Sequence, residues 1–520
     1  MKTIKIKLKL GLLIGGIFCI SNCTSDFEEV NTNPLALDLS LLENDPLLQG
    51  QLFSRAQFQT FYSNFQTGQS LGGDIWAQYF ATTQSRFESD RYVMVGGWVN
   101  NQWRIHYTEE IKQLKTVMDL SEANGNQVAN AMAKIWWVHA FQRLTDYMGP
   151  MPYFEYGNLE LSVPYDSQEA IYSDFFFKLD EAVAQLRANP GGSAYAASDR
   201  VYGGSGDSWL KLANSLRLRV AMRIRFADSA KAQAEAEKAV ADGVFLENSE
   251  AAYVETDEVN YHRYQAITDW GEFRMSALAE SLLEGYQDPR ISEMYAPAED
   301  GDSDGDGSAY EGLLNGQSVL TLEAGQNSNH SDMALKWKSI ALGGANPPYT
   351  VINAAEVYFL RAEGAILGWN MGGTAKDLYE EGIRKSMTEI TDADTATIES
   401  YIASSNTPIP YEDGAMPSTD IPVAFETDSE RQLEQIITQK WIANYGSGVE
   451  SWAELRRTGY PKQYERVLSD NPNVGPDEII SRMIYPSSEY DTNLEELQKA
   501  IDNLLGGPDE ASTKLWWDKN

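Results

Sequence analysis

The segment Trp209-Leu-Lys-Leu-Ala-Asn-Ser-Leu-Arg-Leu-Arg-Val-Ala-Met-Arg223 decides the fold class of this chain. Its apolar residues Leu212, Leu216 and Val220 recur every four positions, which places them on one face of an α-helix. Arginines interrupt the same helix and need acidic partners, because an unpaired buried charge is costly. Acids such as Glu356 and Glu363 are available to lock helix to helix. The segment therefore predicts a packed helical scaffold.

Helical periodicity of the same kind runs along most of the chain, and it occurs in pairs. Turn residues separate the members of several pairs, as at Asn124-Gly125-Asn126 and Gly446-Ser447-Gly448. No alternation is long enough for a large sheet. We predict a mostly α fold built on TPR-like helix hairpins, although no strict repeat period is present. The predicted pairs are 111–120 with 128–144, 168–186 with 207–226, 354–368 with 375–387, and 433–445 with 449–457.

A long insert at about 250–350 departs from this pattern. It is rich in Gly, Pro and Asp and holds scattered aromatic residues. Such composition predicts long irregular loops at the surface, where binding residues usually lie. We expect these loops to carry part of a ligand site.

The first residues predict export. Residues 1–9 carry four lysines and no acid, and an apolar run from Leu10 to Ile20 follows. This run is about half of the roughly 20 apolar residues that a membrane-spanning helix needs. The pattern is typical of a secretory signal peptide, here residues 1–22.

The only two cysteines, Cys19 and Cys23, lie at the end of this segment, so no disulfide holds the mature fold together. The sequence Ile20-Ser21-Asn22-Cys23 is typical of a lipobox, in which the thiol of Cys23 is acylated. Asn22 departs from the Gly, Ala or Ser that is usual there, and a leftover signal-peptide cysteine is the alternative. Two acyl chains anchor a protein stably, because each buried CH₂ contributes about 0.8 kcal/mol. We predict Cys23 as the lipid anchor.

The charge of the chain excludes one class of partner. The formal net charge is −35, and removal of the four signal lysines makes it −39. A surface of this charge repels phosphate backbones, which argues against nucleic acid. With 13 Trp and 27 Tyr, the chain has the aromatic content of a folded protein rather than of a disordered acidic one.

Several motifs in order along the chain resemble the SusD/RagB family, in particular its SusD-like 2 branch. One departure is Met148-Gly-Pro-Met-Pro, where that family more often has Tyr-Gly-Asp-Ile-Pro, and this touches only a turn. The matching segments are Phe27-Glu-Glu-Val-Asn-Thr-Asn-Pro34, Thr145-Asp-Tyr-Met-Gly149, Pro152-Tyr153, 209–223, Asp288-Pro-Arg290, Ala355-Glu-Val-Tyr-Phe-Leu-Arg-Ala-Glu363, Gln439-Lys-Trp441, 452–461, Tyr485-Pro-Ser-Ser-Glu489 and Trp516-Trp-Asp518.

The resemblance implies a function and a partner protein. It implies that residues 23–520 form a single SusD-like α-helical domain, lipid-anchored to the cell outer membrane and facing the exterior. Such proteins capture a polysaccharide, an oligosaccharide or sometimes a peptide and deliver it to a SusC-like TonB-dependent transporter. They show no catalysis. The acidic stretch that follows Cys23 also resembles the surface-export tag of such lipoproteins.

The residues themselves offer little to an enzyme. The four histidines lack metal-binding spacing, and no phosphate-binding loop is present. Carboxylates are abundant, so an α-helical glycoside hydrolase stays open as an alternative. A lipoprotein that binds the transporter and a peptide or no sugar is another. Neither the glycan nor the stoichiometry with a transporter can be read from the sequence.

Two regions hold the residues that we predict to bind sugar. Sugar rings present apolar C–H faces to aromatic rings and hydroxyls to planar polar groups. The step Gly96-Gly97 predicts a loop that presents Trp98, while Trp136-Trp137 and Trp516-Trp517 are assigned to the core. Family members build their site in about these two regions. The candidates are Trp76, Tyr79, Arg91, Tyr92, Trp98, Asn100, Asn101 and Trp103 in the first region, and Tyr295, Tyr310 and Trp337 in the insert.

The insert also holds an acidic loop with calcium-binding spacing. Residues 300–311 fit Asp-x-Asp-x-Asp-Gly-x₅-Glu, in which carboxylates converge on the ion and glycine permits the turn. Against this, Gly307 stands where an aliphatic residue is usual and Pro297 spoils the entering helix; a solvated acidic loop is the alternative. The candidate ligands for a structural Ca²⁺ are Asp300, Asp302, Asp304, Asp306 and Glu311.

Overall fold

The structure is a computed structural model that describes residues 45–158, 160, 162–302, 305, 307–323, 327–412 and 415–519. The chain divides into two units at Leu48, and apart from the first residues of α4 (Pro46–Gln59) every element described below belongs to the unit Gln49–Asn520. This unit is mostly helical, as predicted. No helix among the described residues is both long enough and apolar enough to span a membrane.

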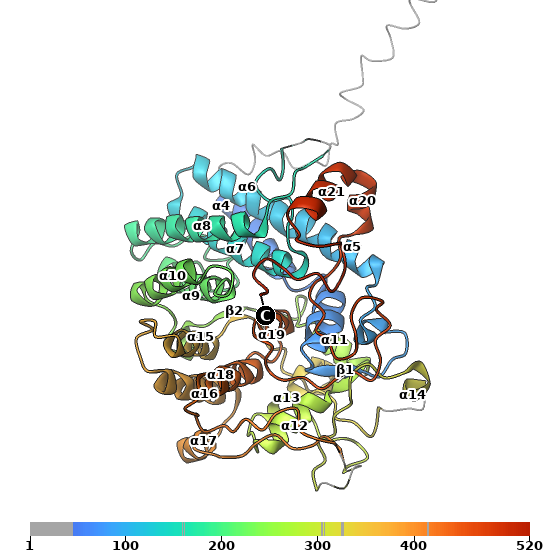
Figure 1. Ribbon diagram of the computed structural model, residues 1–520. Helices are drawn as coiled ribbons and strands as arrows, with labels where there is room; N and C mark the ends of the chain where they lie inside the picture. The colour runs from blue at the N-terminus through green and yellow to red at the C-terminus, as the bar shows by residue number, and fades with distance from the viewer. Residues whose placement is uncertain are drawn as a thin grey trace, which may run out of the picture. The chain divides into compact units, whose positions relative to one another are not determined.

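All eight helices of the predicted pairs are confirmed, and they stack in layers (Figure 1). Polar side chains accept a backbone N–H at the start of most of them, for example Ser167 for α8 and Asn353 for α15. The bounds are α6 Lys112–Ala123, α7 Gln127–Met148, α8 Gln168–Ala188, α9 Gly206–Arg223, α15 Ala354–Ile366, α16 Ala375–Ile390, α18 Ser429–Ala443 and α19 Gly448–Thr458.

The pairing of these helices differs from the prediction in two places. Helix α9 packs against α10 (Ser229–Asp242) as well as α8, and α10 was not predicted because its buried stripe consists only of alanines. Helix α19 packs chiefly against the π-helix η1 (Phe65–Asp74) rather than against α18, which instead lies on α15. The predicted pairs α6–α7, α8–α9 and α15–α16 are therefore confirmed, whereas α18 and α19 are separated because η1, from the N-terminal region, packs against α19.

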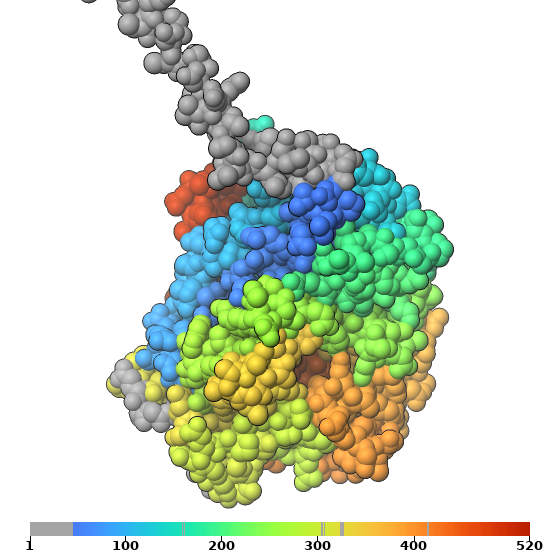
Figure 2. Space-filling model, turned by 180° about the vertical axis from the view of Figure 1, so that it is seen from behind, coloured from blue at the N-terminus to red at the C-terminus, as the bar shows by residue number. Residues whose placement is uncertain are grey.

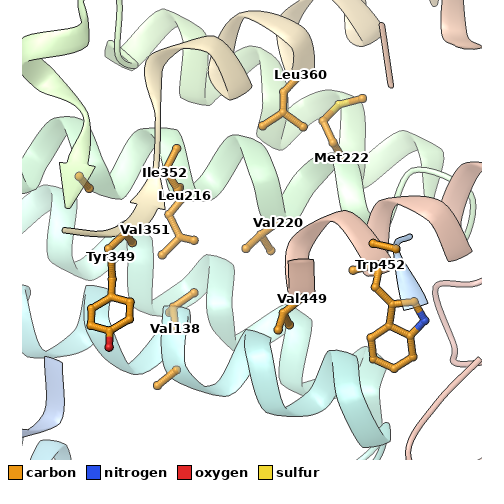
Figure 3. Close-up of a cluster of buried hydrophobic side chains, with 14 of the residues drawn as sticks. Val138, Leu216, Val220, Met222, Tyr349, Val351, Ile352, Leu360, Val449 and Trp452 are labelled. Atoms are coloured by element: carbon orange, nitrogen blue, oxygen red, sulfur yellow. The ribbon is translucent and has the colours of Figure 1, made fainter. Parts of the chain in front are cut away.

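The hydrophobic core lies where these helices meet. Figure 3 shows Val138 of α7, Leu216 and Val220 of α9, and Val449 of α19 pointing into one cluster. These side chains are at most 3% exposed. Trp136, Trp137 and Trp517 are buried, as predicted, while Trp516 is half-buried. The apolar stripe read from the segment 209–223 is thus the contact face of the scaffold.

The arginines of α9 form buried ion pairs, as the sequence analysis expected. Arg219 binds Glu356 of α15 at 2.7 Å, and Arg223 binds Glu454 of α19 at 2.6 Å. Glu363, however, pairs with Arg457 and Arg225 rather than with an arginine of α9. These pairs join helices that are distant in the sequence.

The insert is less irregular than predicted. Its strand β3 (Phe273–Met275) pairs antiparallel with β1 (Phe80–Thr82), and β2 (Ala252–Val254) pairs with β4 (Tyr349–Ile352). The β1–β3 pair joins the two predicted binding regions, and Figure 2 shows the insert, in yellow-green and yellow, gathered on one face. Its other elements are η4 (Asn248–Glu250), α11 (Tyr264–Asp269), α12 (Ala277–Gly285), α13 (Ile291–Met294), α14 (Val319–Glu323), η5 (Leu335–Trp337) and η6 (Ile340–Leu342).

The remaining helices lie outside the predicted pairs. Helix α5 (Gly96–Ile105), the π-helix η3 (His106–Ile111) and α6 form one continuous helical path, in which the π segment interrupts the α register. Such π segments are frequent at functional sites. The others are η2 (Glu88–Arg91), α17 (Thr395–Ile402), α20 (Ser487–Thr492) and α21 (Leu494–Asn503).

Candidate functional site

Helix α5 presents one face to a groove of about 660 Å³. Gly97, Asn100, Asn101 and Arg104 line the groove from positions three and four apart, which is the spacing of one helical face. The predicted loop at Gly96-Gly97 is wrong, because both glycines belong to the first turn of α5. A Cβ atom at Gly97 would meet no other atom within 4 Å, so the groove is open there.

Helix α20 forms the opposite wall. Asn100 joins the two walls, since its Nδ2 donates to Ser487 Oγ at 2.8 Å and its Oδ1 accepts from the Ser488 N–H at 3.1 Å. Asn101 donates to Asn64 Oδ1 at 2.8 Å and accepts from Arg104. The wall is polar, with hydroxyl, carboxylate and amide groups from Ser487, Ser488, Glu489, Asp491, Thr492 and Asn493.

Aromatic side chains form the floor between these walls. Trp103 and Tyr107 lie 4.9 Å apart between ring centroids, and Tyr156 stands 5.3 Å from Tyr107. The hydroxyl of Tyr156 donates to the Tyr107 carbonyl, and burial raises the pKa of Tyr156 to about 12. The phenols of Tyr107 and Tyr156 are therefore neutral at physiological pH, and each donates its proton to a backbone carbonyl, of Pro152 and Tyr107 respectively. The groove combines an apolar floor with planar polar walls, as ligand sites usually do.

Four of the predicted sugar-binding rings, Trp76, Tyr79, Tyr92 and Tyr295, lie in the core instead. Trp76 and Tyr79 are 3% and 1% exposed, and Tyr295 is 1% exposed. Tyr79 stacks on Trp441 with ring centroids 4.3 Å apart, and Trp76 packs against Trp452. The prediction that these rings face a sugar is contradicted by this burial. Their contacts within the protein occupy the surfaces that a ligand would need.

The structure does bring together residues from the two predicted regions. Tyr445 contacts Tyr79, Tyr295 and Trp337, with ring centroids 5.4 to 5.7 Å apart. Trp337 is half-buried and its Nε1 donates to the Glu293 carbonyl at 3.1 Å. Residues of the two predicted regions therefore do meet. Their rings pack the insert against the helical scaffold and do not form an exposed aromatic surface.

The other candidates are divided between surface and core. Trp98 is half-buried beside Phe87, packs against the hydrophobic core and does not line the groove, whereas Tyr310 is half-buried in the insert. Arg91 and Tyr92 are buried, and Arg91 binds Asp470 at 2.6 Å. Of the predicted binding residues, Asn100, Asn101 and Trp103 line the groove, and Trp98 does not.

The acidic loop is described in part. Asp302 accepts from the backbone N–H groups of Gly305 and Gly307, and Asp300 accepts from Ser328. Asp304 and Asp306 lie outside the described residues, as does Cys23. Within the described ranges, no three His, Cys, Asp or Glu side chains are placed to hold a metal ion. Calcium binding therefore stays a prediction.

The second wall of the groove, formed by α20, was not predicted from the sequence. The motif Tyr485-Pro-Ser-Ser-Glu489 was read only as part of a resemblance, and Tyr107 and Tyr156 were not singled out. A run of small hydroxyl residues after a proline, followed by acids and Asn493, is a signal for an exposed polar turn. Nothing in the sequence placed that turn beside α5, because about 390 residues separate Asn100 from Ser487 in the chain.

A helical scaffold with a ligand-sized groove, floored by aromatic rings and walled by amides and hydroxyls, defines a class of small-molecule or oligomer binding protein. A model of the SusD-like family, described as Susd and RagB outer membrane lipoprotein, matches residues 29–518. The chain belongs to this family.

Solved structures of similar fold agree with this assignment, although no curated protein matches the chain. A chitin-binding SusD homologue from Flavobacterium johnsoniae is 32% identical, with a TM-score of 0.83 over 91% of this chain and 99% of that chain. A SusD homologue from Bacteroides uniformis is 32% identical, with a TM-score of 0.80 over 92% and 100%. Another, from Bacteroides thetaiotaomicron, is 31% identical, with a TM-score of 0.80 over 91% and 99%.

Proposed function

We propose that this protein is a non-catalytic glycan-binding lipoprotein that captures an oligosaccharide in the groove between α5 and α20. The observation that carries the proposal is the composition of the groove. The half-buried ring of Tyr156 and the exposed edges of Trp103 and Tyr107, which are 6% and 9% exposed, offer apolar surface for sugar C–H groups, and the walls offer acceptors and donors for hydroxyls. The similar chitin-binding protein supports an oligomer of N-acetylglucosamine as the first ligand to test.

The hydrogen bonds of the Glu489 carboxylate favour binding rather than hydrolysis. Its carboxylate accepts from Trp103 Nε1 at 3.1 Å, from the Tyr165 hydroxyl at 2.8 Å and from Asn493 Nδ2 at 3.2 Å. A group so held is poorly placed to give and take a proton in each turnover. Release of reducing ends from a bound polysaccharide would contradict this part of the proposal.

The mouth of the groove offers a clean test. Because a side chain at Gly97 has free space, Gly97→Leu should fold normally and block the groove, and leucine favours the helix by about 0.8 kcal/mol over glycine. Gly96→Leu is the matched control, because Gly96 has the same free space but does not line the groove. We expect retardation in glycan-containing native gels for the native protein and Gly96→Leu, and its loss for Gly97→Leu. Equal retardation of all three would place the ligand elsewhere.

We further propose that the protein is lipid-anchored through Cys23, faces the cell exterior and delivers its glycan to a SusC-like TonB-dependent transporter. The family model, which describes outer membrane lipoproteins, supports the membrane assignment. Cys23→Ala should release a soluble or uncleaved form, because the chain has no other cysteine after the signal segment. Unchanged membrane fractionation of this variant would contradict the anchor.

Calcium binding at residues 300–311 is a separate proposal, supported by the carboxylate spacing of the loop. Chelation by EDTA should lower the melting temperature of the native protein and leave Asp302→Ala unchanged. A melting temperature that EDTA does not change would contradict calcium binding, and residues 300–311 would then be an acidic loop that binds no ion.

A further inference from the structure

The groove holds three charged side chains that differ in exposure. Arg104 and Asp491 are exposed to solvent, whereas Glu489 is half-buried. The partners of the Glu489 carboxylate are the neutral donors of Trp103, Tyr165 and Asn493, and among the described residues no lysine or arginine forms an ion pair with it. The groove therefore holds a half-buried carboxylate, Glu489, that no cation among the described residues pairs with, in addition to the exposed Asp491.

The effect of the Glu489 charge extends across the floor. Burial raises the pKa of Tyr107 and of Tyr165 well above the usual range, and the negative charge of Glu489 is the next cause in both. Arg104 does not offset it equally, since an exposed charge is screened by water and salt over about 8 Å at physiological ionic strength. Its guanidinium is also engaged with Asn101. The exposed Arg104 therefore offsets the negative charge of Glu489 only in part.

The carboxylate also has capacity for one more donor. An ionised carboxylate offers about four lone-pair sites, and three donors occupy the Glu489 oxygens. A donor that carries positive charge forms a hydrogen bond roughly twice as strong as a neutral one. A ligand carboxylate or sulfate has no donor to offer and is repelled.

We propose that Glu489 sets the charge specificity of the groove, so that it selects amino sugars over neutral sugars and rejects uronic or sulfated glycans. This inference rests on the proposed function, because it concerns the same groove. The ligand class is an oligosaccharide with free protonated amines, such as a deacetylated oligomer of N-acetylglucosamine. The position of Glu489, rather than the overall acidity of the chain, determines the preference.

The test uses the full mature protein and three oligomers of equal length, made of glucosamine, N-acetylglucosamine and galacturonic acid. Calorimetric titration at mildly acidic pH, where the amines are protonated, should rank them in that order. We expect glucosamine to bind roughly fivefold to tenfold more tightly than N-acetylglucosamine. Higher salt should reduce this advantage in the native protein, which supplies a readout that needs no variant.

Two variants separate Glu489 from its neighbour. Glu489→Gln keeps an acceptor for Trp103 and should abolish the preference for glucosamine while improving the binding of galacturonic acid. Asp491→Asn, at an exposed position of the same wall, should change the preference by less than about twofold. Thermal melts of both variants confirm folding.

The outcomes distinguish this inference from the proposal on which it rests. If N-acetylglucosamine binds, Gly97→Leu blocks it, and Glu489→Gln or salt leaves the ranking unchanged, the charge inference is wrong and the groove assignment stands. If none of the three oligomers binds the native protein, or Gly97→Leu binds them normally, the proposed function itself fails.

Discussion

Arg457 in the scaffold and Arg104 in the groove are used in opposite ways. Arg457 is fully buried and contacts both oxygens of Glu363, at 2.5 and 2.7 Å, and also Glu454 at 2.6 Å. Arg104 is exposed, and its recorded partner is the neutral amide of Asn101. The arginine side chain joins helices through buried ion pairs at position 457, and it is exposed to solvent at the groove surface at position 104. Burial and partners, rather than residue type, decide which role it takes.

Carboxylates show the same difference through their pKa values. Burial alone would raise the pKa of Glu454, yet Arg457, Lys440 and Arg223 hold it well below the usual range. For Asp74 of η1, burial dominates and raises the pKa to about 7, against smaller opposing effects of the Tyr264 hydroxyl and the Gly448 N–H. The scaffold thus contains both compensated and uncompensated buried acids.

The largest effect should come from removal of a compensated cation. Arg457→Met leaves Glu363 and Glu454 buried with fewer cations, which should lower the free energy of unfolding by about 3–5 kcal/mol. Arg104→Met, at the exposed position, should change it by less than about 0.5 kcal/mol. Denaturant melts of the two variants measure both changes. Similar losses of unfolding free energy in both would show that the buried and the exposed arginine contribute equally to stability.

A smaller effect is expected at Asp74, and it depends on pH. Because its pKa is about 7 in the folded state and about 3.9 when unfolded, the folded protein holds this proton between these values. Stability from Asp74 is therefore present at low pH and is lost as pH rises towards 7. Between pH 8 and pH 5, native stability relative to Asp74→Asn should rise by roughly 2–3 kcal/mol.

Measuring the difference between native protein and variant at each pH cancels the titration of the other acids. A difference that is independent of pH would show that Asp74 is ionised in the folded state. It would also mean that its hydrogen bonds with Tyr264 and Gly448 outweigh its burial.

The sequence predicted the scaffold better than the site, for a physical reason. The apolar period of segments such as 209–223 depends on local helix geometry, so all eight helices could be placed to within a few residues. Helix α10 was missed because alanines at 232, 236 and 239 give little contrast in hydrophobicity. The strand pair β1–β3 was missed because three residues are too few to show alternation.

The site depends on contacts that sequence spacing does not encode. Asn100 was singled out as a candidate and lies on the groove, but its bonds to Ser487 and Ser488 depend on how distant parts of the chain fold together. Aromatic residues were the weakest guide, because Tyr79 and Trp98 were chosen on the same grounds although Tyr79 is buried and Trp98 is only half-buried. Periodicity identifies a face of a helix, and only the tertiary structure identifies what covers it.

Trp98 and Trp76 test the comparison between surface and scaffold with a single residue type, and a smaller change in stability is expected for Trp98→Ala than for Trp76→Ala. If the half-buried Trp98, one residue beyond the groove-lining Gly97, stacks on a bound sugar, Trp98→Ala should weaken glycan binding by about 1–3 kcal/mol, by analogy with stacking on nucleic-acid bases. Its free energy of unfolding should fall by less than about 1 kcal/mol. Trp76→Ala removes a ring packed on Trp452 in the core and should cost roughly 3–5 kcal/mol of stability.

Calorimetric titration and denaturant melts of both variants separate the two roles. Phe87, whose ring centroid lies 6.3 Å from that of Trp98, is the contact that could make Trp98 structural instead. Normal affinity with a large loss of stability in Trp98→Ala would mean that this contact dominates. Trp98 would then belong with Trp76 to the scaffold, and ligand recognition would depend on the floor formed by Trp103, Tyr107 and Tyr156.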